Sequence, residues 1–537
     1  MEPHFATVWE SIADGLPQEP AVIQGDRRVT WREFEDRAAR LASYLANAGI
    51  GHGSKVGLFL YNSIEYLEGY FAALKIRATP FNVNYRYLDN ELLYLFDNAD
   101  AQAVIVHSSL AKRLVNIIDQ LPQLRTIIIV EDEVDFVEIS IGNRYESVIA
   151  TSSPAPRIER DPLDVTMTYT GGTTGMPKGV VSKIGPAVQG LLQTVPPLLG
   201  HAPFDNPAEC VAIGRVLRDE GRPFTALPAP PLMHATGLAI GAIPALTFGG
   251  RVVLLQHRGL DVDELWDAVE RERVNAITVV GDPFARPMLR ALDAKPRQLD
   301  FVTAISSSGA MFSTEIKAGL LGHMRHAMVI DLIASTEGAM GMSLSTHDNP
   351  AVTGRFFPGA GVIVVNENDE AVAPGSGDIG FVAVPGGADG YYKDEEKTAK
   401  TFRIINGVRY TIPGDFATLE ADGSIMLLGR GSQCINTGGE KVFPEEVEEV
   451  IKTHPTIDDC LIFGVSDERF GQRVVGVVSP RAGMSITVDE VITHSKTLLA
   501  AYKTPRQLVQ VAVVPRTAAG KADYATAHEL FEVSYPS

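Results

Sequence analysis

The stretch Thr170 to Gly179, which reads Thr-Gly-Gly-Thr-Thr-Gly-Met-Pro-Lys-Gly, decides how this chain is interpreted. It follows directly on Val165 to Tyr169, a run that predicts a strand. Glycines allow a backbone to approach a phosphate closely, and their N–H groups can form an anion nest. A flexible turn is the alternative, and a Walker A loop is excluded because Gly179 follows Lys178. The predicted phosphate-binding residues are Thr170, Gly171, Gly172, Thr173, Thr174, Gly175 and Lys178.

The composition is that of a globular enzyme-sized chain of 537 residues. Its formal charge of −19 disfavours nucleic acid as a partner, because phosphate contacts need a basic surface. The three cysteines form no CxxC pair, which favours a reducing, cytoplasmic location over a disulfide framework or a zinc ribbon. No signal peptide is expected, and the apolar stretch 235–250 is too short for a membrane span.

The order of helical and strand patterns predicts an α/β fold. Helices alternate with buried strands over residues 30–130 and again over 165–344, which indicates parallel-type sheets covered by helices. After Gly354, short strands and turns predict a β-rich subdomain, and the segment from Phe443 reads as a small α+β unit. We therefore expect an N-terminal domain over 1–430 and a small mobile C-terminal domain over 431–537.

The glycine-rich stretch resembles the signature of the adenylate-forming superfamily. Members of that superfamily include acyl-CoA synthetases, the adenylation domains of peptide synthetases and firefly luciferase. The resemblance extends over nearly the whole chain, because further motifs follow in the family's order. It implies a large N-terminal domain, a small mobile C-terminal domain, and activation of a carboxylic acid with ATP.

Two further motifs of the N-terminal domain carry the resemblance toward the acyl group. Pro231 to Gly237 matches the family's histidine motif, which implies that His234 lies beside the acyl carboxylate. The segment with Ser308, Gly309 and Ala310 resembles the one that lines adenine and the start of the acyl tunnel. Taken as isolated sequence, the histidine could be a packed core residue and the serine-rich segment a simple turn.

The segment 331–337 resembles the family's Tyr-Gly-x-Thr-Glu motif. The resemblance implies that Thr336 binds a phosphate and that Glu337 holds Mg²⁺, whose hard charge prefers carboxylate oxygen. A helix cap is the alternative interpretation. Ile333 stands where the family has an aromatic residue, so the motif departs from the pattern. The nucleotide-binding candidates here are Asp331, Leu332, Ile333, Ala334 and Ser335.

The remaining motifs lie around and beyond the expected domain boundary. The resemblance implies that Asp415 binds the ribose hydroxyls, that Arg430 reaches ribose or phosphate, and that Lys521 bridges the acyl carboxylate and the α-phosphate. Ser432 falls at the family's hinge, where Asp or Lys is usual. A glycine loop that admits pantetheine is expected to comprise Gly438, Gly439, Glu440 and Lys441.

These motifs together predict an acyl-CoA synthetase, closest to the actinobacterial fatty-acid or steroid-side-chain acyl-CoA ligases. The expected cofactors are ATP (leaving as AMP), Mg²⁺ and coenzyme A, with Glu337 as the metal ligand. The segment between Lys183 and Leu227 looks longer than usual, which suggests a large hydrophobic or polycyclic acid. Two alternatives stay open: an enzyme efficient in only one half-reaction, and a non-catalytic sensor of acyl groups or nucleotides. The sequence leaves open a homodimer.

Overall fold

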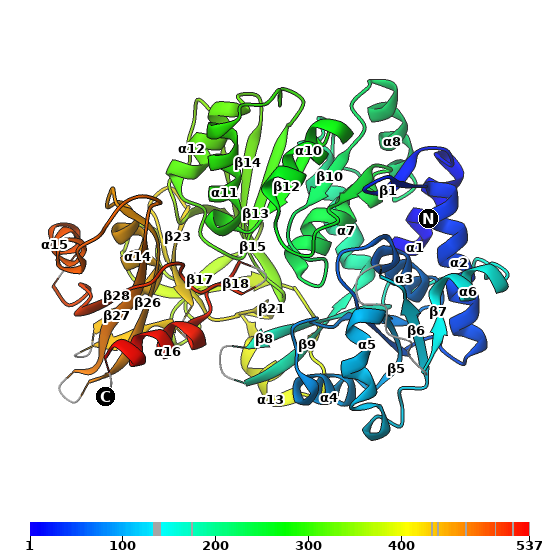
Figure 1. The fold of residues 1–537 in the computed structure, drawn as a ribbon, viewed down its shortest axis with the longest axis horizontal. Coiled ribbons are helices and arrows are strands. Elements are labelled where there is room, and N and C mark those ends of the chain that lie inside the picture. Colours follow the sequence, from blue (N-terminus) through cyan, green and yellow to red (C-terminus); the bar gives the residue numbers. More distant parts are fainter. Residues whose placement is uncertain are drawn as a thin grey trace.

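The computed structural model describes residues 1–132, 141–172, 175–430, 433–437, 440–467, 470–499, 501–517 and 520–535. Among these residues the strands form three sheets. Two of them build the larger part of the molecule, and the third lies at the C-terminal side, on the left in Figure 1. The α/β fold expected from the sequence is confirmed. The boundary between residues 430 and 431 stays a prediction, because residue 431 lies outside the described residues.

The first sheet is parallel in its centre and antiparallel at the end that carries the phosphate motif. Thr170 and Lys178 face each other across the antiparallel pair β8–β9. The strands lie side by side in the order β19 (Gly390–Tyr391), β9 (Gly175–Lys183), β8 (Val165–Gly172), β4 (Thr79–Asn82), β3 (Lys55–Phe59), β5 (Ala101–His107), β6 (Thr126–Val130) and β7 (Asn143–Arg144).

The second sheet has a parallel half and an antiparallel half. The antiparallel half begins at the β14–β15 pair and is the β-rich subdomain expected after Gly354. The order is β2 (Arg27–Thr30), β1 (Pro20–Gln24), β11 (Arg251–Leu254), β10 (Thr225–Pro228), β12 (Ala276–Val279), β13 (Ala304–Ser308), β14 (Met328–Ser335), β15 (Gly338–Ser345), β16 (Arg355–Pro358), β23 (Ile425–Arg430), β22 (Asp415–Leu419), β18 (Ile379–Pro385), β21 (Val408–Thr411) and β20 (Phe402–Ile405), with β17 (Ile363–Val365) paired to β18.

Helices cover the faces of both sheets (Figure 1). Thr30 and Glu33 form a capping box, which begins the second helix. The helices of this part are α1 (Phe5–Gly15), α2 (Trp31–Asn47), α3 (Ile64–Lys75), α4 (Asp89–Asn98), α5 (Ser108–Val115), α6 (Tyr145–Thr151), α7 (Ile184–Leu198), α8 (Glu209–Asp219), the π-helix η2 (Thr236–Ala242), α9 (Ile243–Thr247), α10 (Val262–Glu272), α11 (Gly281–Ala294), α12 (Thr314–His323) and α13 (Glu395–Thr401).

The C-terminal sheet has its own hydrophobic core. Helix α14 packs on this sheet through Val447 and Ile451, which share a buried cluster with Ile462 and Val478. Its strands are β25 (Glu440–Val442), β24 (Ile435–Thr437), β27 (Gly471–Pro480), β26 (Ile457–Asp467) and β28 (Gln507–Gln510), and its helices are α14 (Pro444–Lys452), α15 (Val488–Leu498) and α16 (Tyr524–Ser534).

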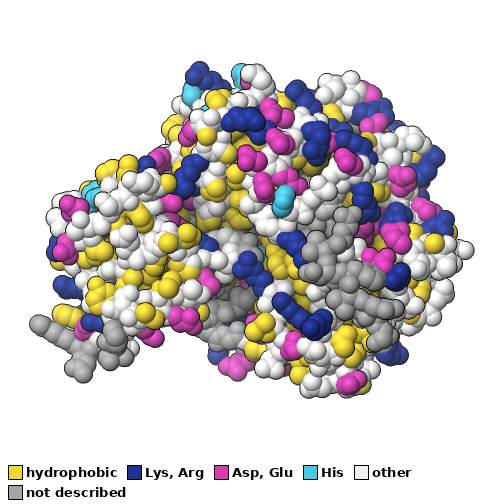
Figure 2. Space-filling model, viewed as in Figure 1, with side chains coloured by type: hydrophobic (Ala, Val, Ile, Leu, Met, Phe, Trp, Pro, Cys, Tyr) yellow, Lys and Arg dark blue, Asp and Glu magenta, His cyan; other side chains and the backbone are white. Residues whose placement is uncertain are grey.

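The fold places the sequence motifs at one edge. The histidine segment follows the carboxyl end of β10, and Gly309 follows the carboxyl end of β13. The glycine-rich hairpin lies against the carboxyl end of β4, where Asn82 binds the backbone of Tyr169 and of Met233. Ligands of α/β sheets bind at this edge, because the connections there lead away from the strands and leave a crevice. Figure 2 shows a hollow where the C-terminal part meets the rest, with Lys and Arg side chains beside it.

In the part of the chain that the structure describes, no helix combines the length and apolar character that crossing a bilayer requires. Cys210 and Cys460 are buried, Cys434 is half-buried, and none of these three described cysteines forms a disulfide.

Candidate functional site

The glycine-rich motif forms the end of a β-hairpin. The sequence predicted a loop from Thr170 to Lys178, but strand pairing continues past these two residues to Gly172 and Gly175. The register shifts between Thr170 and Gly172, so Pro177 falls in an irregularity where its missing N–H interrupts no regular pairing. The loop prediction was therefore wrong in extent, because glycine and proline did not end the ladder. Thr173 and Thr174 lie outside the described residues.

Asn82, at the end of β4, joins this hairpin to the histidine segment. Its Oδ1 accepts from the Tyr169 N–H at 2.7 Å, and its Nδ2 donates to the carbonyl oxygens of Tyr169 and Met233 at 2.9 and 2.7 Å. The amide thus satisfies backbone groups of two segments that are far apart in sequence. We did not identify Asn82 from the sequence, although a polar residue closing a buried parallel strand was a usable signal.

His234 lies just before the π-helix η2, and its side chain is half-buried. Burial, followed by the charges of Lys521 and Arg86, lowers its pKa from 6.5 to about 4. The imidazole is therefore neutral near pH 7, with one N–H to donate and one nitrogen to accept. A neutral histidine of this kind can orient a carboxylate without neutralising its charge.

Lys521 reaches the large part of the molecule from the C-terminal part. A Cβ at Gly309 would lie 3.3 Å from Lys521 Cε, so the absence of a side chain at Gly309 makes room for the lysine. Gly309 also has a φ of +94°, a conformation that glycine adopts without strain. The structure thus brings together His234, Gly309 and Lys521, three candidates that lie in separate segments of the sequence. Ser308 is buried and Ala310 half-buried beside them.

The loop that carries Lys521 is closed by its own backbone and fits against α11. Thr517 N donates to the carbonyl oxygen of Lys521 at 2.8 Å, and Thr517 Oγ1 accepts from Lys521 N at 3.2 Å. A Cβ at Gly520 would come within 2.9 Å of the Phe284 ring, so the loop approaches α11 as closely as a glycine permits. This tight fit fixes where the lysine side chain leaves the loop.

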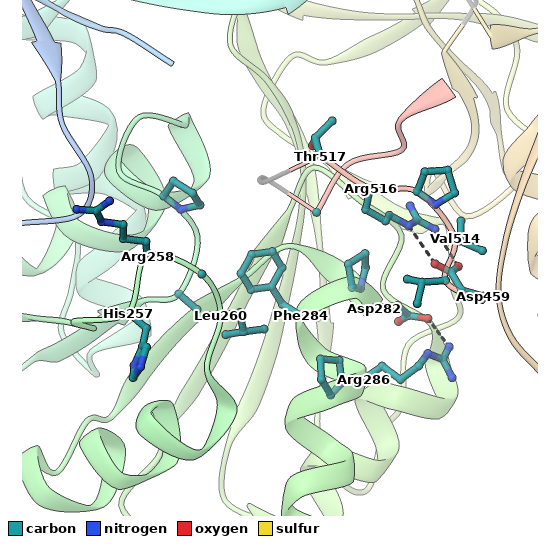
Figure 3. A pocket seen from close by; sticks show the side chains of 18 of the residues that line it. His257, Arg258, Leu260, Asp282, Phe284, Arg286, Asp459, Val514, Arg516 and Thr517 are labelled. Atoms are coloured by element: carbon teal, nitrogen blue, oxygen red, sulfur yellow. Dashed lines mark hydrogen bonds and ion pairs between the residues drawn. The ribbon is translucent and has the colours of Figure 1, made fainter. Parts of the chain in front are cut away.

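A half-buried ion pair anchors the start of the same loop. The Arg516 guanidinium donates to both carboxylate oxygens of Asp459, at 2.8 and 3.0 Å (Figure 3). Burial alone would raise the pKa of Asp459, but Lys452 and Arg516 outweigh it and hold the pKa below its usual value. We did not identify this pair from the sequence, because nothing links residues 57 positions apart without the fold.

A cavity of about 690 Å³ lies next to this loop, between the C-terminal part and the large part (Figure 3). Its wall carries an excess of cations, with Asp282 bound to Arg286 on one side and the Arg516–Asp459 pair on the other. The charged residues of the wall are Arg86, Arg258, Arg286, Arg290, Arg516, Asp282, Asp458 and Asp459, and His257 lines it as well.

Lys178 and Glu337 meet a segment that the sequence did not point to. The ammonium of Lys178 lies 2.9 Å from Asp394 Oδ2, and the hydroxyl of Tyr391 donates to Glu337 Oε1 at 2.6 Å. Tyr391 is in β19, which pairs with β9, and Asp394 caps α13. The hydrogen bond with Lys178, together with the backbone N–H of Lys397, lowers the pKa of Asp394.

The segment 331–337 ends β14 and turns into β15. The helix cap considered for Thr336 and Glu337 is excluded, because both lie in the turn of a β-hairpin. Ile333 packs in the core of the β-rich subdomain with Met340 and Phe356. Leu332, Ala334 and Ser335 are half-buried.

Asp331, on the same strand, is buried beside another lysine. Its Oδ2 lies 3.4 Å from Lys317 Nζ. Burial raises the pKa of Asp331 to about 6 although Lys317 opposes the shift. The Asp331 carboxylate thus already has a partner within the protein, the ammonium of Lys317.

The residues expected around the ribose and the hinge are partly described. Asp415 is buried, follows Gly414 with its φ of +99°, and lies opposite Arg430 in the β22–β23 ladder. Glu440 and Lys441 pair through their backbones with β24. Ser432, Gly438 and Gly439 lie outside the described residues.

Among the described residues, no three His, Cys, Asp or Glu side chains form a metal cluster of their own. Mg²⁺ generally binds through one or two carboxylates and completes its shell with water and substrate phosphates. Glu337, close to Lys178 and its partners, is a donor of this type.

Comparison with known proteins places the chain among nucleotide-dependent enzymes. Residues 9–392 match the family described as AMP-binding enzyme, and residues 446–521 match the AMP-binding enzyme C-terminal domain. A 3-oxocholest-4-en-26-oate–CoA ligase of Rhodococcus rhodochrous is 40% identical over 542 residues, covering 97% of this chain and 94% of the relative. A medium/long-chain-fatty-acid–CoA/3-oxocholest-4-en-26-oate–CoA ligase of Mycobacterium marinum is 38% identical, covering 98% and 96%.

Solved structures share the fold at lower identity. ATP-bound MatB from Rhodopseudomonas palustris superposes with a TM-score of 0.81 at 23% identity over the full length of both chains. The anthranilate CoA ligase AuaEII, in complex with anthranoyl-AMP, gives 0.80 at 19% identity and covers 97% of this chain and 96% of that one.

Proposed function

Since the chain belongs to the AMP-binding enzyme family and is an ATP-dependent acid–thiol ligase, we propose that it converts a large hydrophobic or polycyclic carboxylic acid into its CoA thioester through an acyl-adenylate. The observation that carries the proposal is the convergence of Lys521, His234 and Gly309 at the edge of the second sheet. Lys178 and Glu337 supply a charged group for phosphates nearby.

In the first step a carboxylate oxygen attacks the α-phosphorus of ATP. The new bond joins the acyl oxygen to that phosphorus, the bond to the bridging oxygen breaks, and pyrophosphate leaves. Lys521 offsets the repulsion between carboxylate and phosphate, and neutral His234 orients the carboxylate. Lys178 binds the departing phosphates, with Thr170 and the hairpin glycines beside it. Glu337 would hold Mg²⁺, which neutralises phosphate charge when bound.

In the second step the sulfur of coenzyme A attacks the acyl carbon and AMP leaves, while the thiol proton passes to solvent. A free carboxylate resists attack by a thiol because it would have to expel an oxide ion. In the adenylate the leaving group is AMP, which departs far more readily. Asp415 and Arg430 are proposed to hold the ribose of AMP, and Gly438 and Gly439 to admit the pantetheine. Movement of a domain over 431–537 would withdraw Lys521 between the two steps.

The names of the relatives support a bulky acid as substrate, since two of them act on a steroid acid. Within the segment 183–227, Val188 and Leu192 of helix α7 pack in the same core as Met233, which precedes His234.

The test supplies ATP, Mg²⁺, CoA and a panel of acids to the protein and identifies products by mass. We expect CoA esters of steroid-side-chain and long-chain acids, with acetate a poor substrate. Preference for acetate would overturn the assignment of the substrate class. Acyl-AMP without acyl-CoA, or a CoA ester only from supplied acyl-AMP, would instead identify an enzyme of one half-reaction, and no product at all would favour a sensor. We further propose a cytoplasmic location, which cell fractionation tests. We also propose a homodimer, which a measurement of molecular mass in solution tests.

A further inference from the structure

A second lysine, Lys397, lies next to the cluster formed by Lys178 and Glu337. Its ammonium is 4.5 Å from the centre of the Tyr391 ring, and the hydroxyl of this tyrosine donates to Glu337. Lys397 is in the first turn of α13, a helix that lies close to β8 and β9 (Figure 1). The side chain therefore extends toward the acidic residue proposed to hold Mg²⁺.

Asp394 ties both lysines to the same place. Its Oδ1 accepts from the backbone N–H of Lys397 at 3.0 Å, while its Oδ2 lies 2.9 Å from the ammonium of Lys178. One capping carboxylate at the end of the glycine-rich hairpin thus holds the side chain of Lys178 and the backbone of the turn that carries Lys397. Burial and the charge of Lys178 lower the pKa of Lys397, which agrees with two ammonium groups held close together.

The positive and negative charges of this cluster balance when no ATP or pyrophosphate is bound. Lys178 faces Asp394, and Lys397 lies on the ring of Tyr391, whose hydroxyl donates to Glu337, so two cations and two carboxylates share this cluster. Once Glu337 binds Mg²⁺, its charge is no longer available to Lys397. The MgATP complex remains a dianion, and two converging ammonium groups are the complement that such a ligand requires.

We propose that Lys397 is a second phosphate-binding cation, which contacts the β,γ-phosphates of ATP and the pyrophosphate that leaves, together with Lys178. The proposal rests on the proposed function of the site and adds a residue to it. Tyr391 and Asp394 then act as positioning residues, the tyrosine for Glu337 and the aspartate for Lys178. In the free enzyme, the Asp394 carboxylate holds Lys178 where the phosphates will bind.

The neighbouring lysines of the same segment do not share this position. Lys393 binds Asp100 at 2.8 Å, and Lys400 pairs with Glu396 one turn away at 2.6 Å on the exposed side of α13. Lys400→Met is therefore a matched control for Lys397→Met, because both remove one charge from one helix. Lys397→Met keeps the aliphatic stem that covers Tyr391, and Lys397→Arg keeps the charge.

The experiment measures binding of ATP, AMP and inorganic pyrophosphate by calorimetry, together with the two half-reactions. We expect Lys397→Met to weaken ATP and pyrophosphate about tenfold, the usual loss for a hydrogen bond to a charged group, and to leave AMP within about twofold. ATP–pyrophosphate exchange should show the matching rise in KM for pyrophosphate. Thioester formation from supplied acyl-adenylate should be unchanged, and Lys397→Arg should recover most of the affinity.

The proposal is overturned if Lys397→Met binds ATP and pyrophosphate as Lys400→Met does. It is also overturned if affinity for AMP falls as much as affinity for ATP, because a structural defect and not a lost phosphate contact would then explain the change. Failure of the proposed function itself would look different: the unaltered protein would then show no exchange with any acid.

Discussion

The site has two sides that are built in different ways. On the hairpin side, Lys178 and Glu337 are held by partners from β19 and the start of α13, all within the large part of the molecule. On the other side a single residue, Lys521, arrives on a loop of the C-terminal part and rests against Gly309. One side is assembled by the fold of one unit, whereas the other depends on where a second unit lies.

The contacts described between the C-terminal part and the large part are both apolar and polar. They include the packing of Phe443 on Phe416, the fit of Gly520 on Phe284, and ion pairs of Asp458 with Arg286 and Arg290 and of Arg481 with Glu315. Ion pairs at such partly exposed positions contribute about 0–1 kcal/mol each. The difference supports our proposal that the phosphate side stays assembled while Lys521 leaves between the two steps.

Removal of Lys521 is the sharpest way to separate the two sides. We expect Lys521→Ala to slow ATP–pyrophosphate exchange about 1,000-fold, the range found when a charge-stabilising group is lost. Conversion of supplied acyl-adenylate to the CoA ester should stay within about threefold, because the lysine is withdrawn in that step. Lys496→Ala, an exposed lysine of α15, is the control. Equal loss in both half-reactions would contradict the division.

Asp459 tests whether the second side depends on the ion pair that anchors its loop. Asp459→Asn weakens the two hydrogen bonds from the Arg516 guanidinium and the ion pair with Lys452, and we expect the free energy of unfolding of the C-terminal part to fall by about 2 kcal/mol. Asp458→Asn, one residue away, removes the pairs with Arg286 and Arg290 of α11 and should cost less than about 1 kcal/mol. Chemical unfolding and pyrophosphate exchange measure both variants. Similar losses from the two substitutions would show that the Arg516 anchor is no stronger than the pairs with α11.

Tyr391 tests the permanence of the phosphate side. Tyr391→Phe removes the hydroxyl that donates to Glu337 and keeps the ring under Lys397. A hydrogen bond to a charged group is worth about 1.5 kcal/mol, so we expect adenylation to fall about tenfold, with a higher requirement for Mg²⁺. The measurement is kcat/KM for exchange over a magnesium titration. Unchanged magnesium dependence would remove Tyr391 from the site.

The sequence was sufficient for most of the fold, because the strands and helices have clear periodic patterns. The alternation of helices and strands expected over 30–130 is present, as in α2 after Thr30 and β6, since capping and buried β-branched runs are local signals. The glycine-rich hairpin shows the limit. Glycine and proline predict a loop locally, but pairing between β8 and β9 overrides that preference.

The candidate site was predictable only where a motif marked it. His234 and Lys521 were predicted one by one, but their proximity depends on the packing of the C-terminal part. Asp394, Tyr391 and Asp459 were missed, since each acts on a residue distant in sequence through a single side-chain contact. No local pattern encodes such a partner.

The ionisation of His234 provides a pH-dependent test of the contact with Lys521. Its pKa in the folded chain is about 4, below the ordinary 6.5, so an unfolded chain takes up this proton at higher pH than the folded one. Stability from this group is therefore complete above pH 6.5 and is lost as the pH falls toward 4. Replacement of His234 by glutamine should flatten that part of the stability profile, measured by chemical unfolding from about pH 8 to about pH 4.5.

Burial is the main cause of the lowered pKa of His234 and the charge of Lys521 the next, so Lys521→Ala should raise this pKa without restoring it to 6.5. NMR titration of the imidazole checks this, and an unmoved pKa would mean that the lysine does not lie beside the histidine in solution.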